Sequence, residues 1–464
     1  MSDAFDVVVI GGGPGGYVAA IRAAQLGQTV ALVEKENLGG TCLNRGCIPT
    51  KALVKAAGLW RDINHCSEFG FSVSEPRVDF GQVMARKNSV VQTLRSGTEM
   101  LMKSNKISVI RGRAELSRIG EVAVRIADGT ASVIGAQNVI LANGSAPARI
   151  PIPGADLPGV ITSDEALELD SIPKRMVIIG GGVIGIEFAS IFAAFGTEIT
   201  VVEVLPVILP MVDDEISRRL TPLMKKAGIN ILTKTRVERI AKADGGLTVT
   251  VEGASAKNEL NADLVLLATG RVPVTDGIDI PGLGLQMNGR VVAVDQRMRS
   301  NISGVYAIGD LVGGAMLAHV ASAEGIVAAE NCAGIDSVID YRVVPSCIFC
   351  EPEVASVGLT EKEAKDKGFN VKVSKFPFSA NGKALTLGEP NGTVKLIGDA
   401  DTGQVLGGHI MGPHATDLIA EVGLAIKARL TAAAIAHTIH AHPTLAETVA
   451  EAAHGLVSKP LHLA

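Results

Sequence analysis

The same nucleotide-binding pattern occurs twice in the chain, and this duplication limits the possible folds more than any other feature of the sequence. In the first copy, FDVVVIGGGPGGYVAAIRAAQLGQTVALVEK, a buried strand leads into a glycine-rich turn, an alanine-rich helix and a second strand. The glycines of the turn are Gly11, Gly13 and Gly16, and the second strand ends at Glu34. Glycines at this spacing allow a tight turn and a close approach of the backbone to a pyrophosphate, while the acidic residue accepts hydrogen bonds from a ribose. We therefore predict a dinucleotide site, with the phosphates at the helix N-terminus.

The second copy is RMVIIGGGVIGIEFASIFAAFGTEITVVE, with Gly180, Gly182 and Gly185 in the turn and Glu203 at the end of the second strand. A single copy would be weak support, because glycine-rich turns between a strand and a helix also occur for packing alone. Both copies, however, have the complete strand, helix and strand, and both carry the acidic residue at the same spacing. The sequence therefore predicts an α/β protein with two Rossmann-like dinucleotide-binding domains.

The composition is that of a large globular protein. The chain has 464 residues, of which 47% are apolar and 20% charged, enough for three or four domains. The net charge of -5 argues against a nucleic-acid partner, which requires a basic surface. No apolar run reaches the roughly 18 residues of a membrane span, and the N-terminal stretch MSDAFDVVVIGGG lacks the basic and apolar segments of a secretory leader. We expect a cytoplasmic protein without a membrane segment.

The segment GGTCLNRGCIPTK holds two of the six cysteines, Cys42 and Cys47. In a regular helix, side chains five positions apart point about 140° away from each other, and their Cα atoms lie roughly 8 to 9 Å apart. A disulfide needs a Cα separation below roughly 7 Å. Gly46 and Pro49 loosen or bend a helix and would allow the sulfurs to meet. The residues alone leave a redox couple, a metal site and two unrelated thiols as open possibilities.

A zinc site would need further ligands. His65 and Cys66 follow downstream, but they are adjacent rather than spaced as in zinc motifs, so we predict no metal site. The other cysteines, Cys66, Cys332, Cys347 and Cys350, are interpreted most simply as small core residues or inert thiols, although the last two have the spacing of a redox pair.

Three later segments carry polar residues at the ends of predicted elements. ATGRVP follows a buried strand that stops at Gly270. In YAIGD, a strand at residues 305–308 leads to Asp310, whose carboxylate would hold the hydroxyls of a cofactor; the less favoured alternative is a turn or capping aspartate. IHAHPTLAE contains two histidines, and an imidazole has the intrinsic pKa that a base for a thiol needs at neutral pH.

Taken together, GGTCLNRGCIPTK, the paired nucleotide folds, ATGRVP, YAIGD and HAHPTLAE resemble the disulfide-reductase flavoproteins. The resemblance covers essentially the whole chain, in the order of the family's motifs. It implies an FAD-binding domain with a redox disulfide at residues 1–147, an NAD-binding domain at 148–271, a central domain at 272–340 that completes the FAD site, and a C-terminal α+β interface domain at 341–464. It also implies a homodimer.

The resemblance implies a role for each residue of the redox centre. Cys42 exchanges disulfides with the substrate, and Cys47 lies against the flavin. His442, directly before a proline, is the base, and Glu447 orients its ring and favours its charged form. His440 has the same chemistry but does not match the motif, so we interpret it as structural.

The resemblance also implies which residues bind the cofactors. Lys51 would lie near the flavin ring, where a cation stabilises the negative charge of the reduced form, and would pair with Glu187 on the helix of the second copy. Without the resemblance, both would be interpreted as surface charges. His319 would lie at a helix end beneath the flavin. The complete set is Gly11, Gly13, Gly16, Glu34, Lys51, Gly144, Asp310 and His319 for FAD, and Gly180, Gly182, Gly185, Glu187, Glu203 and Gly270 for NAD.

The implied activity is the reoxidation of protein-bound dihydrolipoyl groups, with electrons passing through the Cys42–Cys47 disulfide and FAD to NAD⁺. The expected partners are the lipoyl domains of 2-oxoacid dehydrogenase or glycine-cleavage complexes. A glutathione-type reductase would use NADPH and carry arginines after the last strand of the second copy, but VEVLPVILP has none. A mercuric reductase would carry a C-terminal cysteine pair, and GLVSKPLHLA has none. A non-catalytic carrier of FAD and NAD would need neither the cysteine pair nor His442.

Two positions depart from the family pattern. Asn143 in LANGSAP stands where relatives usually have threonine, and Val274 in ATGRVPV stands where many have asparagine. Both flank the predicted cofactor sites. We therefore expect local hydrogen bonding in these loops to differ, without a change in the reaction.

Overall fold

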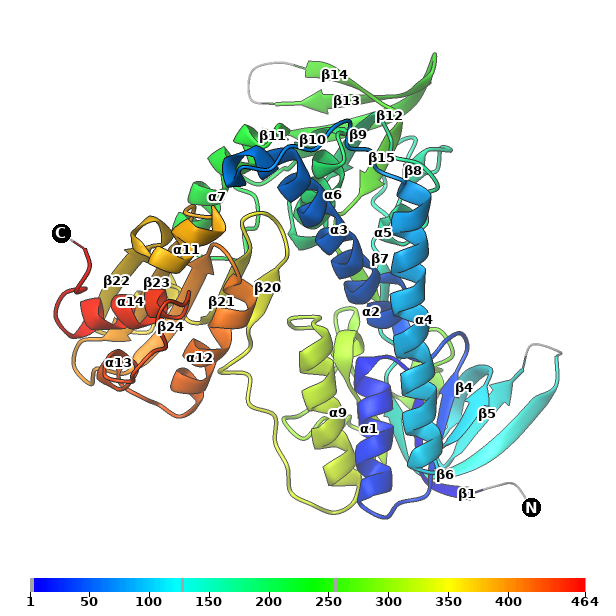
Figure 1. Ribbon diagram of the computed structural model, residues 1–464. Coiled ribbons are helices and arrows are strands. Elements are labelled where there is room, and N and C mark those ends of the chain that lie inside the picture. The colour runs from blue at the N-terminus through cyan, green and yellow to red at the C-terminus, as the bar shows by residue number, and fades with distance from the viewer. Residues whose placement is uncertain (1–3, 127–128, 254–256, 464) are drawn as a thin grey trace.

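The computed structural model describes residues 4–126, 129–253 and 257–463. Figure 1 shows three lobes: a first nucleotide-binding unit at the bottom, a second at the top and a C-terminal unit at the left. The chain starts in the lower lobe, passes through the upper one, returns to the lower one and ends in the left one. The lower lobe is therefore built from two segments that lie far apart in the sequence.

The first unit has the strand, helix and strand that the first glycine pattern predicts. Its elements are β1 (Ala4–Ile10), α1 (Pro14–Gln25), β2 (Val30–Glu34), α2 (Gly40–Arg45), α3 (Cys47–His65), η1 (Cys66–Phe69), α4 (Phe80–Ser104), β3 (Ser108–Arg111), β4 (Arg113–Arg118), β5 (Glu121–Arg125), β6 (Ala131–Leu141) and β7 (Ser145–Pro147). Among the described residues, the sheet order is β3-β2-β1-β6-β5-β4. Strands β3, β2, β1 and β6 are parallel, and β5 and β4 are antiparallel. The buried part of β1, residues 7–10, and β2 up to Val33 are continuous apolar runs because the middle of a parallel sheet is covered on both faces.

The second unit repeats this arrangement around the second glycine pattern. Its elements are β8 (Val160–Ile161), α5 (Ser163–Ala166), β9 (Arg175–Ile179), α6 (Val183–Ala194), β10 (Glu198–Val202), α7 (Asp214–Lys226), β11 (Ile229–Leu232), β12 (Arg236–Ala243), β13 (Gly246–Glu252), β14 (Lys257–Ala262) and β15 (Leu264–Leu267). In the described part of the chain, the parallel sheet has the order β11-β10-β9-β15-β8, and β12, β13 and β14 form a separate antiparallel sheet. Both predicted nucleotide units are therefore doubly wound α/β structures.

The segment after the second unit returns to the first one. It contains β16 (Arg271–Pro273), α8 (Ile280–Leu283), β17 (Met287–Asn288), β18 (Val291–Val292), β19 (Val305–Ala307), η2 (Gly309–Val312) and α9 (Ala318–Cys332). Strand β19 pairs with β6, β16 pairs with β7, and α9 lies beside α1 (Figure 1). Leu285, Val292 and Leu311 share a hydrophobic core with Val8 and Ile10. This segment is thus joined to the first sheet, while the boundaries at 147, 271 and 340 stay predictions.

The C-terminal unit is an antiparallel sheet with helices on it, the α+β structure that was predicted. It contains β20 (Ser346–Ile348), β21 (Val354–Gly358), α10 (Glu361–Asp366), β22 (Val371–Pro377), η3 (Phe378–Ala380), α11 (Gly382–Leu387), β23 (Thr393–Asp399), β24 (Val405–Met411), α12 (Ala415–Lys427), α13 (Ala432–Ala436) and α14 (Glu447–Val457). The sheet order in the described residues is β20-β21-β24-β23-β22. Lys395 on β23 joins this unit to the second one, because its buried Nζ lies 3.0 Å from each carboxylate oxygen of Asp213.

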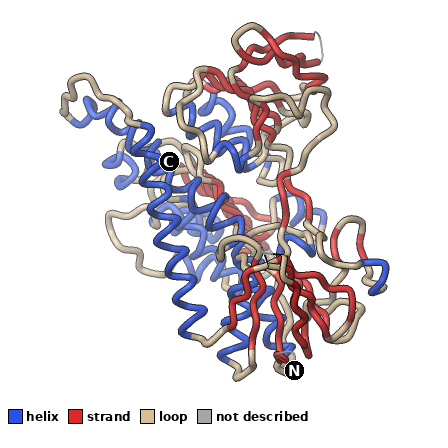
Figure 2. Tube along the Cα trace, turned by 90° about the vertical axis from the view of Figure 1, so that its right-hand side faces the viewer, coloured by secondary structure: helices blue, strands red, loops and turns tan. Residues whose placement is uncertain are grey.

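Two long helices connect the lobes. Figure 1 shows α4 running from the lower lobe toward the upper one, with α3 beside it, and Figure 2 shows the long helices along one side of the lower sheet. Leu53 and Ala57 of α3 are buried in one core with Ile186 and Phe188 of α6. The N-terminal end of α3, where Cys47 lies, therefore sits at the junction between the two nucleotide units.

Candidate active site

The two cysteines lie on either side of a break between two helices. Helix α2 ends before Gly46, whose φ of -143° and ψ of -113° are not helical, and α3 begins at Cys47. A Cβ at Gly46 would lie 3.0 Å from the carbonyl oxygen of Thr41 and 3.3 Å from the Cα of Cys42, so only glycine fits this close turn. The thiols of Cys42 and Cys47 share a hydrogen bond across the break. Gly46 thus overcomes the separation that a continuous helix would impose.

The surroundings give the two thiols opposite properties. The pKa of Cys47 is lowered to about 7, first because the Cys42 thiol donates a hydrogen bond to it and then, against the opposing effect of burial, because Lys51 is nearby. The same hydrogen bond raises the pKa of Cys42, and burial raises it further. In the reduced pair, Cys47 is therefore the thiol that ionises first, and Cys42 keeps its proton.

Lys51 is held by a carboxylate of the second nucleotide unit. Its Nζ lies 3.0 and 2.9 Å from the two carboxylate oxygens of Glu187 on α6, and 4.4 Å from the ring centroid of Phe349. The backbone N–H of Phe349 donates to Glu187 at 3.0 Å. Glu187 is 4% exposed, so the interpretation of this glutamate as a surface charge is wrong. No pattern in the sequence indicates a role for Phe349, an ordinary apolar residue between two cysteines.

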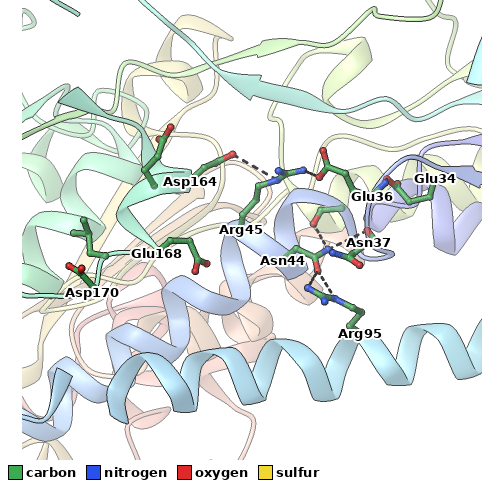
Figure 3. A pocket seen from close by; sticks show the side chains of 12 residues that line it. Glu34, Glu36, Asn37, Asn44, Arg45, Arg95, Asp164, Glu168 and Asp170 are labelled. Carbon is green, nitrogen blue, oxygen red and sulfur yellow. Dashed lines mark hydrogen bonds and ion pairs between the residues drawn. The ribbon is translucent and has the colours of Figure 1, made fainter. Parts of the chain in front are cut away.

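Asn44 fixes the helix that carries Cys42. Its amide nitrogen donates to the carbonyls of Leu38 at 3.0 Å and Gly40 at 2.9 Å. Its amide oxygen accepts from Arg95 of α4, from Nε at 3.0 Å and Nη2 at 2.8 Å. Figure 3 shows this contact at the wall of a cavity of about 750 Å³ between the first two units. Sequence reasoning missed Asn44 and Arg95, because their contacts join residues far apart in the chain.

The neighbouring Arg45 crosses the same cavity. It forms ion pairs with Glu36 of the first unit and, at 3.8 Å, with Asp164 on α5 of the second unit (Figure 3). The cavity is lined by Glu34, Glu36, Asn37, Gly40, Asn44, Arg45, Arg95, Asp164, Glu165, Glu168, Leu169 and Asp170. The redox segment is thus attached to both nucleotide units.

The first glycine turn has the close contacts that the pattern predicts. Gly11 has a φ of 104°, and a Cβ at Gly16 would lie 1.8 Å from the carbonyl oxygen of Gly11. The carboxylate of Glu34 accepts from the backbone N–H groups of Gly12 and Glu36, both at 2.7 Å. A Cβ at Gly11 or Gly16 would collide with the backbone of the first unit, so glycine allows the tight turn that is typical of a dinucleotide site.

The loop with Asp310 is held by hydrogen bonds to side chains of neighbouring segments. Asp310 accepts a hydrogen bond from the Ser145 hydroxyl, which itself accepts from Nε of Arg271 at 2.7 Å. Gly144 lies beside them and accepts from the N–H of Val274 at 3.0 Å. Asp310 is therefore held by side chains as well as by its place in η2.

The two family departures have local partners. The amide nitrogen of Asn143 donates to the carbonyl of Asp276 at 3.1 Å, and Val274 uses its backbone N–H for Gly144. The buried amide oxygen of Asn143 has no hydrogen-bond partner among the described residues. A buried acceptor next to the first turn fits a ligand with hydroxyl groups, as FAD has. His319, predicted to lie beneath the flavin, is the second residue of α9, and its Nε2 lies 2.9 Å from the carbonyl oxygen of Pro345.

The second glycine turn repeats the first one and borders a cavity of about 700 Å³. Gly180 has a φ of 111°, and a Cβ at Gly185 would lie 2.0 Å from the carbonyl oxygen of Gly180. Glu203 accepts from the N–H groups of Gly181 and Leu205, both at 2.7 Å. The cavity is lined by Gly180, Gly182, Glu203, Gly270 and also Arg236. The segment just after β10 has no arginine, as the sequence shows, but Arg236 reaches the cavity from β12.

The predicted base and its carboxylate lie together on the C-terminal unit. Nδ1 of His442 is 2.8 Å from Glu447, whose other oxygen accepts from the N–H of Thr444 at 2.8 Å. Burial opposes ionisation of Glu447, but Thr444 and His442 outweigh it and lower its pKa. The His442 side chain is 80% exposed, and its segment, just before α14, lies well apart from α2 in Figure 1. The single chain therefore does not bring His442 to Cys42.

His440 has a different setting. Its side chain is 10% exposed, with Nε2 2.9 Å from Glu421 and Nδ1 2.8 Å from the carbonyl of Thr438. Both ring nitrogens have partners within the C-terminal unit. This geometry supports the structural role that the sequence suggested.

The remaining cysteines do not assemble a further site. Helix α3 has 19 residues, so its end residues Cys47 and His65 lie about 27 Å apart along the axis and cannot bind one zinc ion. Cys347 packs on the core of the C-terminal unit, whereas Cys350 is buried in the core around α6. Cys66 is only partly buried and is not a core residue. Within the described ranges, no group of three or more histidine, cysteine or acidic residues is arranged to hold a metal ion.

The comparison with known protein families decides the assignment. The model described as pyridine nucleotide-disulphide oxidoreductase matches residues 5–325, and the model of the dimerisation domain of these enzymes matches residues 344–453. The chain belongs to the pyridine nucleotide-disulphide oxidoreductases. FAD and NAD are the cofactors of this family, and the two glycine turns fit one dinucleotide each.

Relatives and solved structures cover the whole length of this oxidoreductase. It is 43% identical to a dihydrolipoyl dehydrogenase of Geobacillus stearothermophilus, over 99% of this chain and 97% of the relative. It is 45% identical to a dihydrolipoyl dehydrogenase of Chlamydia muridarum, over 100% and 99%. The structure of LpdA from Mycobacterium tuberculosis has a TM-score of 0.91 at 27% identity, and covers 98% of this chain and 99% of its own. A copper(II) complex of the flavoprotein disulfide reductase RclA from Escherichia coli has a TM-score of 0.88 at 30% identity, over 98% and 99%. In the described ranges, no helix is long and apolar enough to cross a membrane.

Proposed function

We propose that this chain is a dihydrolipoyl dehydrogenase, which oxidises the dithiol of dihydrolipoyl groups and reduces NAD⁺. The observation that carries the proposal is the Cys42–Cys47 pair, hydrogen-bonded across the break at Gly46 and lying between the two nucleotide units. The names of the full-length relatives support the dithiol substrate. An adjacent cysteine pair is the group that exchanges with a dithiol, because thiolates attack disulfides through a mixed disulfide.

The first step is a thiol–disulfide exchange. His442, oriented by Glu447, takes the proton of one substrate thiol, and the thiolate attacks Sγ of Cys42 in the oxidised pair. The bond between the two cysteine sulfurs breaks, and Cys47 leaves as a thiolate. The lowered pKa of Cys47 makes it the better leaving group, with the charge of Lys51 contributing.

The second step releases the product. His442 gives its proton to Cys42 as that sulfur leaves, and it accepts the proton of the remaining substrate thiol, which attacks the substrate sulfur of the mixed disulfide. His442 then releases this proton to solvent. The substrate is now a cyclic disulfide, and two electrons have moved to the cysteine pair. Bound FAD supplies the transfer of this electron pair to NAD⁺. Lys51, held by Glu187, stabilises negative charge where the two nucleotide units meet.

The base comes from the second subunit of a dimer in this proposal. The chain carries the dimerisation domain of the family, and His442 is exposed on that domain. In a twofold dimer, the same pair of surfaces meets twice, so each active site would combine Cys42 and Cys47 of one chain with His442 of the other.

The cofactor roles of single residues are proposed on the same grounds. Gly11, Gly13, Gly16, Glu34, Lys51, Gly144, Asp310 and His319 would hold FAD, and Gly180, Gly182, Gly185, Glu187, Glu203 and Gly270 would hold NAD. The expected protein partners are lipoyl domains of 2-oxoacid dehydrogenase or glycine-cleavage complexes. The cytoplasmic location stays a prediction.

A panel of reductants tests this function. NAD⁺ reduction should be fast with dihydrolipoamide and slower by at least about 100-fold with glutathione, which lacks the second thiol that closes the product ring. Cys42→Ser should abolish the activity, whereas Cys66→Ser, at the far end of α3, should leave it unchanged. Faster turnover with glutathione, its disulfide or mercuric ion than with dihydrolipoamide would overturn the proposal in favour of another disulfide reductase. Inactivity toward the entire panel, in a protein loaded with FAD, would indicate a non-catalytic carrier.

A further inference from the structure

Glu324 on α9 is a buried carboxyl group that the mechanism does not use. It is 2% exposed, and both of its oxygens have a donor. One oxygen accepts from the backbone N–H of Gly309 at 2.6 Å, and the other accepts from the hydroxyl of Tyr341 at 2.6 Å. Burial of a carboxylate is costly unless hydrogen bonds compensate it. An apolar side chain would be the simpler choice for packing alone, so the carboxylate indicates a use for its two acceptors.

The Gly309 contact controls the loop that carries Asp310. Gly309 has a φ of 69°, a left-handed conformation, and it begins η2 directly before Asp310. Gly309 lies just after the end of β19. Its N–H donates to Glu324, and this hydrogen bond fixes the orientation of the Gly309 backbone. Asp310 then projects toward Ser145 of the first unit, with which it is hydrogen-bonded.

The Tyr341 contact fixes the carboxylate itself. Tyr341 lies in the segment between α9 and β20, which leads to the C-terminal unit. Burial raises the pKa of Glu324, and the nearby Asp310 adds to this, whereas Tyr341 and Gly309 lower it. The tyrosine hydroxyl therefore opposes the effect of burial on this pKa and holds the carboxylate in place toward Gly309.

Helix α9 is also held close to the first glycine turn. A Cβ at Gly325 would lie 2.5 Å from the carbonyl oxygen of Gly15, so the two helices touch through their backbones here. Glu324 is thus placed where the first turn, the Asp310 loop and the segment to the C-terminal unit meet.

We propose that Glu324 is a positioning residue of the FAD site. By holding the N–H of Gly309, it sets the backbone from which Asp310 reaches the cofactor, and Tyr341 holds Glu324 in that orientation. This inference rests on FAD as the ligand of the first unit, and it does not depend on the dithiol substrate.

The test is a titration of the apoprotein with FAD, in which the decrease in flavin fluorescence measures binding. Glu324→Ala should raise the FAD dissociation constant about 10- to 100-fold, because it removes a charge-assisted hydrogen bond and leaves Gly309 without an acceptor. Glu324→Gln keeps an acceptor oxygen, so it should recover most of the affinity. Tyr341→Phe should weaken binding about threefold to tenfold in the wild-type background and have no further effect in Glu324→Ala, because its partner is then already missing.

Glu330→Ala is the matched control. Glu330 lies on the same helix and pairs with Arg22 of α1 at 2.6 Å, so its loss weakens the packing of α9 on α1 without touching Gly309. It should leave FAD affinity unchanged.

Three results would overturn the proposal. The first is an equal loss of FAD affinity in Glu330→Ala and Glu324→Ala, and the second is an equal loss in Glu324→Gln and Glu324→Ala. The third is additive effects of Tyr341→Phe and Glu324→Ala. If Glu324→Ala does not fold, Glu324→Gln and Tyr341→Phe decide: loss of affinity in Tyr341→Phe but not in Glu324→Gln supports it, and any other result contradicts it. Inactivity of FAD-saturated wild-type protein toward dihydrolipoamide would refute the proposed function and leave this result untouched.

Discussion

The two glycine turns are almost the same locally and differ in what surrounds them. Gly11 and Gly180 have φ values of 104° and 111°, and the strand-ending glutamates Glu34 and Glu203 accept backbone hydrogen bonds of equal length, 2.7 Å. One position before the last glycine of the pattern, however, the first copy has Gly15 and the second has Ile184.

This difference determines how closely α9 approaches the first turn. A Cβ at Gly15 would lie 2.9 Å from the carbonyl oxygen of Ala321 on α9, so glycine lets α9 close over the first turn. Ile184 instead lines the open cavity of about 700 Å³. Likewise, a Cβ at Gly13 would lie 3.9 Å from Gly40 in the redox segment, whereas one at Gly182 would have no neighbour within 4 Å. The same local pattern thus serves one turn that α9 packs against and one turn, the open site, where Ile184 faces a cavity instead of a helix.

Exchanging the residues that differ, Gly15 and Ile184, should have the largest effect. Gly15→Ile should weaken FAD binding by roughly 100-fold, because the side chain collides with the α9 backbone, which cannot move cheaply. Ile184→Gly, the reverse change in the second turn, should leave FAD binding unchanged and affect only NAD. The measurement is FAD content after gel filtration together with titration of the apoprotein. A Gly15→Ile protein that retains wild-type FAD affinity would show that enclosure by α9 does not distinguish the two sites.

The next largest effect concerns the dinucleotide in the open site. Glu203 can accept from the 2′-hydroxyl of NAD and repels the 2′-phosphate of NADP. We expect kcat/KM for NADP⁺ to be about 10- to 100-fold below that for NAD⁺. Glu203→Gln should narrow this ratio, since Arg236 then faces the phosphate without a competing carboxylate.

The control for this change is Arg236 itself. In the Glu203→Gln background, Arg236→Ala should remove the gain with NADP⁺. A wild-type protein without preference, or a ratio that Glu203→Gln leaves unchanged, would contradict the assignment of Glu203 to the ribose.

A smaller effect is expected on the pKa of Cys47, which lies between the two nucleotide units. The absorbance of reduced protein at 240 nm should report ionisation of Cys47 with a midpoint near 7. Lys51→Met should move the midpoint upward, since the lysine lowers this pKa, and Lys55→Met on the exposed side of α3 should not move it. Because the folded-state pKa lies below the roughly 8.5 of an unfolded thiol, this thiolate stabilises the reduced protein above that value, and its contribution is lost as the pH falls through about 7. Identical midpoints in the two lysine variants would exclude Lys51 as the stabilising charge.

The sequence predicted the parts of the site that depend on local chain geometry. Both glycine turns and the break at Gly46 lie within short segments, where spacing and residue type determine the contacts. The pairing of His442 with Glu447 came from the family resemblance. The Lys51–Glu187 ion pair came from the family resemblance, since nothing in either helix indicates the other.

The contacts that the sequence could not predict join ordinary residues across lobes. Glu324 with Tyr341, Asn44 with Arg95 and Phe349 with Lys51 depend on how separate elements pack. A charged or amide side chain in a helix is typical of a solvated surface, so the pattern around it gives no warning of a buried role. Arg236 was missed for the same reason, because it approaches the open site from a different sheet.

A heterodimer of one Cys47→Ser chain and one His442→Gln chain, isolated with two tags, tests the shared active site most directly. If each site takes its cysteines from one chain and His442 from the other, one site receives both defects and the second is intact. About half the wild-type activity should then return, although each mutant homodimer is nearly inactive, because loss of a general acid–base costs on the order of 10² to 10⁴ in rate. Activity no higher than that of the mutant homodimers, in a heterodimer that is folded and loaded with FAD, would contradict a site built from two chains.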